Sequence, residues 1–124
     1  MLKKTFTYTD YNGVERTEDH YFNLTKAEIL ELEATTTGGL SEYIKRIVAA
    51  QDMPSIYNLF KTIVMKAYGQ KSDDGKRFIK KDRSGYPLAE EFAQTEAFSE
   101  LIYELATDDK AAAAFMNSIV PNAN

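Results

Sequence analysis

The residues with the greatest potential for chemistry are basic, and six of them lie in one short stretch. Between Gln70 and Pro87, six Lys or Arg stand against three Asp, a local balance of +3 in a chain of net charge -4. Basic side chains at this density can hold phosphate groups. The glycines here do not follow a strand and open a helix at the spacing of a nucleotide-binding loop, so no phosphate cradle is predicted. The basic residues are Lys71, Lys76, Arg77, Lys80, Lys81 and Arg83.

We interpret this basic segment, residues 70–87, as a solvated structural loop. The letters SDDGK predict a turn, and KRFIKK fits one short strand with Phe78 or Ile79 as its anchor and the lysines in water. Contact of Lys80 and Lys81 with an acidic protein partner is the functional alternative. Nucleic acid ranks last, because the chain is acidic overall and aromatic residues for base stacking are few here.

Other candidates for catalysis or metal binding lack partners. His20 is the only histidine, and beside Asp19 on a strand it is typical of a surface or half-buried structural residue. Glu96 and Glu100 share a helix face without a matching set from other helices, so no di-metal site is predicted. We expect no enzyme activity and no cofactor.

Length and composition favour one small globular domain, residues 1–124. At this length folding buries roughly two-thirds of the surface that the unfolded chain exposes to water. This is enough for a stable core without disulfides or a structural metal. The chain has no cysteine, and no apolar run approaches the ~20 residues that span a bilayer. We therefore expect a cytoplasmic protein that does not enter a membrane.

Residues 1–24 predict a β-hairpin. Apolar side chains occupy even positions in both halves of this segment, the alternation of half-buried strands. For the even positions of two antiparallel strands to share a face, paired residue numbers must have an even sum. This selects a three-residue loop at 11–13, with Gly13 in the left-handed region. The residues expected inward are Leu2, Phe6, Tyr8, Val14, Phe22 and Leu24.

Residues 25–120 predict a helical bundle, interrupted by the basic segment. Thr25 and Glu28 fit the capping box of a first helix, and Gly38 and Gly39 suit its end. An amphipathic helix over residues 40–51 follows.

A central helix follows the amphipathic one. Ser41 is the expected cap of the amphipathic helix, Asp52 is the expected cap of the next, and Gly69 its expected end. Residues 54–68 of this helix are apolar over most of its circumference, which indicates that it is central or has a second partner surface.

The C-terminal third predicts two more helices. One long helix is expected over residues 87–106, with Leu88, Phe92, Phe98, Leu101, Ile102 and Leu105 inward. Thr107 or Asp108 is the expected cap of the last helix. The predicted fold class is therefore α+β, an N-terminal hairpin followed by a mostly helical bundle.

Three blocks of the sequence resemble the small tail assembly chaperones of long-tailed bacteriophages and prophages. They are YTDYNGVERTEDHYFNLTKAE, FKTIVMKAYGQKSDDGKRFIK and EFAQTEAFSELIYELATDDKAAAAFMNSIVP. The resemblance implies a non-enzymatic helper that binds the long helical tape measure protein while tail tube subunits polymerise around it. A second copy of the chain and the tail tube protein are further partners to consider. Such proteins are often made in a longer form by ribosomal frameshifting, with which the final PNAN is compatible.

The last helix offers candidate contact residues for such a partner. Phe115, Met116, Ile119 and Val120 form an apolar stripe, and neighbouring alanines permit close approach. The alternative is that this stripe simply closes the core. Two other functions stay open: a virion component, such as a tail-completion or connector subunit, and a small nucleic-acid-binding regulator.

Overall fold

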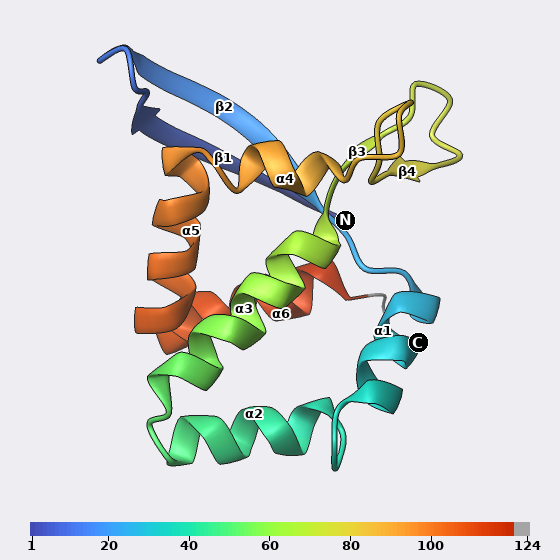
Figure 1. Cartoon of the computed structure of the whole chain (residues 1–124), viewed down its shortest axis with the longest axis vertical. Coiled ribbons are helices and arrows are strands. Elements are labelled where there is room, and N and C mark those ends of the chain that lie inside the picture. The colour runs from blue at the N-terminus through green and yellow to red at the C-terminus, as the bar shows by residue number, and fades with distance from the viewer. Residues whose placement is uncertain (121–124) are drawn as a thin grey trace.

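In the computed structural model, which describes residues 1–120, a β-hairpin leads into a set of helices (Figure 1). The predicted α+β class is confirmed. The final PNAN lies outside the described residues. The strands are β1 (Leu2–Thr9), β2 (Glu15–Phe22), β3 (Tyr68–Lys71) and β4 (Phe78–Ile79). The helices are α1 (Lys26–Thr35), α2 (Leu40–Ala49), α3 (Met53–Ala67), α4 (Leu88–Phe92), α5 (Glu96–Thr107) and α6 (Asp109–Ile119).

The hairpin has the predicted register. Strand β1 pairs antiparallel with β2 from Leu2↔Phe22 to Thr9↔Glu15, so every pair of residue numbers has an even sum. Gly13 has a φ of 78°, as a three-residue loop requires. Most of the even-numbered apolar residues are buried or half-buried. Val14 was expected inward but is 54% exposed, because it lies at the turn, beyond the reach of the core.

The sheet has four strands in the order β1-β2-β3-β4, two more than the hairpin alone. Strand β3 follows α3 directly and pairs with β2 through Tyr21↔Gly69 and Phe22↔Tyr68. Strand β4 is the short strand predicted in the basic segment, and Gly75 forms the predicted turn before it with a φ of 74°. We call the segment from Tyr68 to Pro87 the ribbon. It projects from one side of the molecule (Figure 1).

The prediction that Gly69 ends α3 is wrong. The helix ends at Ala67, and Gly69 lies inside β3. A Cβ atom added to Gly69 would lie 2.5 Å from the ring of Phe78 and 2.6 Å from the carbonyl oxygen of Ile79. Glycine is therefore needed here because β4 packs directly across the backbone of β3.

The helix boundaries follow side-chain caps, with one correction. The capping box of Thr25 and Glu28 is present, and Gly38 and Gly39 have positive φ as predicted. Ser41, however, does not cap α2. Gly39 takes the N-cap position and the Leu40 amide donates to a carboxylate oxygen of Glu33 at 3.0 Å.

The long helix predicted over residues 87–106 is two helices. Thr95 interrupts it, because its hydroxyl donates to the Phe92 carbonyl and accepts from the Phe98 amide. This caps α5 and leaves α4 as a short helix beside β3. Asp108 caps α6, as one of the two predicted residues.

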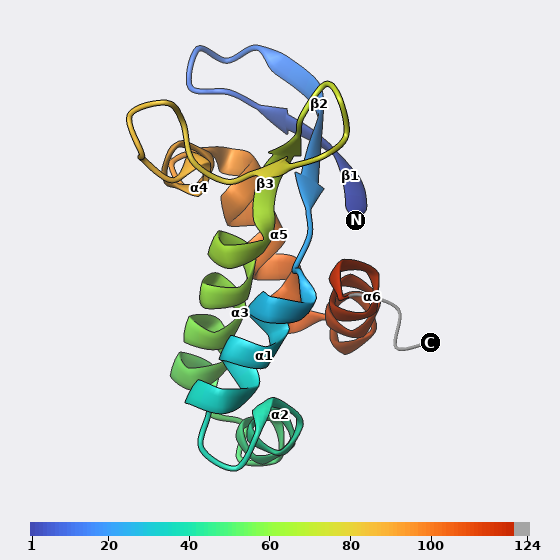
Figure 2. The ribbon, with the colours of Figure 1, turned by 90° about the vertical axis from the view of Figure 1, so that its right-hand side faces the viewer.

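The core lies where the hairpin meets α3, α5 and α6. Side chains of all four elements belong to one cluster, and the sheet lies above it while α2 closes the opposite end (Figure 2). Among its fully buried members are Phe22, Leu24, Ile63, Leu101 and Ile119. No helix within residues 1–120 is long and apolar enough to cross a membrane.

We predict that Gly69→Ala destabilises the fold by about 2 to 3 kcal/mol, because the new methyl group displaces the backbone of β4. Gly13→Ala is the control, with open space around its Cβ and a positive φ, and should cost about 1 kcal/mol. Urea denaturation of both variants measures the difference. Equal losses would show that β4 does not press on Gly69.

Candidate functional site

An apolar groove of about 840 Å³ lies between α2, α3, α5 and α6. Its walls come from four helices, so it exists only because these segments are brought together by the fold. Among the described residues that line it, the one charged residue is Asp109. The apolar lining residues are Ile44, Val48, Met53, Ile56, Phe60, Leu105, Ala106, Ala112, Ala113 and Met116.

The helix sequences explain why the groove stays open. On α2, Ile44 and Val48 are four residues apart and share one face. On α6, Ala112 and Ala113 are too short to reach across to them. The small side chains of α6 thus face the larger side chains of α2, and space remains between the two helices.

The edge of the groove carries exposed apolar side chains. Val48 is 46% exposed and Met53 is 48% exposed, although both are large and hydrophobic. Met116 also lines the groove and is partly buried against the core. Methionine side chains adapt to irregular partners, and an apolar groove between helices can accept the apolar face of another helix.

The structure separates the residues predicted to contact a partner. Phe115 and Ile119 are buried in the core, where the ring of Phe115 packs edge-on against Phe22 at 5.4 Å. Val120 is partly buried against the same core. Of the four apolar residues, Met116 lines the groove. Phe115 and Ile119 therefore lie where the alternative interpretation put them, in a stripe that closes the core. Contact of the stripe with a partner stays a prediction.

Lys80 does not lie in water as expected. Its ammonium group donates to the backbone carbonyls of Asn23 at 2.9 Å and Lys66 at 2.5 Å, and to both carboxylate oxygens of Glu28 at 2.8 and 2.7 Å. Its side chain is 22% exposed. Because Lys66 is in the last turn of α3, the ammonium also satisfies a carbonyl that the helix leaves without a partner. Lys81, the next residue, is exposed as predicted.

The charge of Glu28 is stabilised by the same network. Burial alone would raise its pKa, but hydrogen bonds from Lys80 and from the Thr25 amide outweigh burial and lower the pKa. Glu28 thus both caps α1 and pairs with Lys80. The pair connects the ribbon to the start of the helical region.

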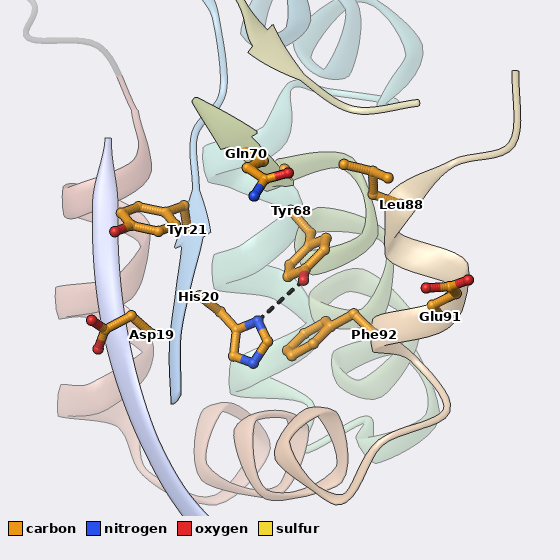
Figure 3. Close-up of a pocket in the computed structure, with 9 residues that line it drawn as sticks. Asp19, His20, Tyr21, Tyr68, Gln70, Leu88, Glu91 and Phe92 are labelled. Atoms are coloured by element: carbon orange, nitrogen blue, oxygen red, sulfur yellow. Dashed lines mark hydrogen bonds between the residues drawn. The ribbon is translucent and has the colours of Figure 1, made fainter. Parts of the chain in front are cut away.

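His20 lies beside a small hollow of about 190 Å³ at the junction of β2, β3 and α4 (Figure 3). Its Nδ1 atom is 3.1 Å from the Tyr68 hydroxyl, and its ring packs on Phe92 with centroids 4.9 Å apart. Burial lowers the pKa of His20, and the nearby Glu18 carboxylate only partly opposes this. Of the surface and half-buried positions predicted for His20, the structure has the half-buried one. Its surroundings are those of an aromatic packing residue, with Tyr68 stacked on Phe92 at 4.3 Å.

Sequence reasoning missed the groove residues of α2, α5 and the start of α3. Val48 was assigned to the apolar face of the amphipathic helix, and Met53 was given no role. The signal that was available is the apolar circumference of α3, which indicated that this helix is central or has a second partner surface. Within residues 1–120, no group of three or more His, Cys, Asp or Glu side chains is placed to hold a metal ion.

A family model described as phage tail assembly chaperone matches residues 1–123. The match covers nearly the whole chain, and the chain belongs to this family. Comparisons with curated proteins and with solved structures gave no match.

We predict that Lys80→Gln lowers the free energy of unfolding by about 2 kcal/mol, because the Glu28 carboxylate and two backbone carbonyls lose a charged donor while partly buried. Lys81→Gln makes the same change one residue away on an exposed side chain and should cost less than about 0.5 kcal/mol. Urea denaturation distinguishes the two. A loss of similar size in both variants would contradict the internal role of Lys80.

Proposed function

We propose that this chain is a non-enzymatic chaperone that binds the tape measure protein during tail morphogenesis in the cytoplasm of the bacterial host. Family membership supports a role in tail assembly. The observation that carries the finer proposal is the apolar groove between α2, α3, α5 and α6. The tail tube protein is a further candidate partner, because its subunits assemble around the tape measure protein.

The groove suits the partner that the family resemblance implies. A long helical protein that has not yet been enclosed by tail tube subunits exposes an apolar stripe along its length, and such stripes aggregate. A groove lined by Val48, Met53 and Met116 can cover that stripe with adaptable side chains. Each 100 Å² of apolar surface buried in the groove contributes about 2.5 kcal/mol before the costs of association are subtracted.

Coverage of a long helix requires several copies. A helix rises about 1.5 Å per residue, so a partner of several hundred residues extends far beyond a groove formed by helices of 10 to 15 residues. We expect chaperone copies to bind at successive positions along one partner.

We predict that Val48→Lys abolishes solubilisation of the cognate tape measure protein when the two proteins are co-expressed, because a charged side chain enters the groove. Val14→Lys is the matched control. It makes the same change at an exposed valine in the hairpin turn, away from the groove, and should leave solubilisation unchanged. The measurements are the soluble fraction of the partner and its recovery with the chaperone by pull-down.

The two possible failures have different meanings. Absence of a complex with the parent chain, with the partner equally insoluble in either case, would contradict tape measure binding and favour a virion component. A complex that survives Val48→Lys but is lost in Val14→Lys would keep the function and move the contact to the hairpin.

A further inference from the structure

Two surfaces outside the groove carry opposite charge and exposed tyrosines. One is a cleft of about 520 Å³ between the hairpin turn, α3 and the start of α5. The other is the ribbon. The proposed function uses neither surface.

The cleft is aromatic and acidic. Tyr11, 77% exposed, and the exposed Tyr57 lie at its edges, and Glu96 lines it. The Tyr11 hydroxyl donates to a carboxylate oxygen of Glu96 at 3.0 Å, which joins the hairpin turn to α5. Glu100 follows one helical turn after Glu96. Residues 88–109 contain five Glu and two Asp and no Lys, Arg or His, so α4 and α5 are strongly acidic.

The ribbon is basic even without Lys80. Two of its three aspartates bind backbone amides of their own turns. The Asp74 carboxylate accepts a hydrogen bond from the Lys76 amide. The Asp82 carboxylate accepts hydrogen bonds from the Ser84 and Tyr86 amides. Tyr86 is strongly exposed. The exposed basic residues are Lys71, Lys76, Arg77, Lys81 and Arg83.

The two surfaces lie on opposite sides of the molecule. In Figure 1 the ribbon projects on the right, and the hairpin turn and the start of α5 lie on the left. Surfaces so placed cannot meet within one chain, but they can meet between copies arranged head to tail. Arginine and tyrosine are enriched among the residues that contribute most of the binding energy at protein interfaces.

We propose that the ribbon of one copy binds the Tyr11–Glu96 cleft of the next copy. The occupant follows from charge complementarity, since this chain itself supplies a basic, tyrosine-bearing segment of the kind that the cleft fits. The contact joins two different surfaces, so it repeats from copy to copy. Exposed ion pairs each contribute at most about 1 kcal/mol, so the association is weak and sensitive to salt. It strengthens when copies are held close together.

Sedimentation velocity of the purified chain tests this contact without any tail protein. We expect the weight-average sedimentation coefficient to rise with protein concentration at low salt, and this rise to be lost at about 0.5 M salt. The acidic surface is reversed by Glu96→Lys with Glu100→Lys, and the basic surface by Lys76→Glu with Arg77→Glu. Each double variant alone should lose the rise.

An equimolar mixture of the two double variants should regain the rise, because each reversed surface then meets a surface of opposite charge. Lys45→Glu with Arg46→Glu is the matched control. It makes the same charge change at exposed residues of α2 and should associate more than either test variant. Circular dichroism melts show whether each variant is folded. A parent chain that shows no concentration dependence at low salt, or a mixture that stays as dispersed as its components, would overturn the proposal and leave the proposed function untouched.

Discussion

The ammonium group of Lys80 joins three parts of the chain that are separate in sequence: residues 23–28, the end of α3 and the residue after β4. It binds the carbonyl of Asn23 after β2, the carboxylate of Glu28 in α1 and the carbonyl of Lys66 at the end of α3, while its own backbone follows β4. Two backbone hydrogen bonds reinforce the same junction, from Asn23 to Ala67 and from Leu24 to Ile119. These contacts hold the sheet and the helices together at the place where α1 begins and α3 ends.

The groove depends on this arrangement. From the junction, α1 and α3 both lead toward α2, which connects them at the far end of the molecule (Figure 1). The core fills the space near the sheet with aromatic side chains, including Phe22, Phe92 and Phe115. Farther from the sheet, the alanines of α6 and the aliphatic side chains of α2 leave the groove open.

The sequence predicted the features that depend on local patterns. The parity of apolar residues determined the hairpin register, and Thr25, Asp52 and Asp108 marked helix starts because their side chains satisfy amides within a few residues. The sequence did not predict strand β3, because its four residues carry no alternation and their pairing depends on the approach of Phe78 to Gly69.

The burial of Lys80 was missed for a similar reason. A lysine within a basic run is usually solvated, and only the fold brings Glu28 and the two carbonyls within reach. The groove is also a property of the assembled helices. The pattern of each helix shows an apolar face, but whether that face is filled or left open depends on side chains that lie far apart in sequence. Met116, which lines the groove, was predicted as a candidate contact residue because it belongs to a visible apolar stripe, whereas Val48 and Met53 were not.

Oxidative footprinting of the methionines tests most directly whether the groove is the contact surface. Met53 lies at the edge of the groove, while Met1 is 57% exposed and does not line it. On formation of the complex with the tape measure protein, the oxidation of Met53 by dilute peroxide should slow several-fold, and that of Met1 should not change. A complex in which Met53 is oxidised as fast as in the free chain would contradict the central claim that the partner helix lies in this groove.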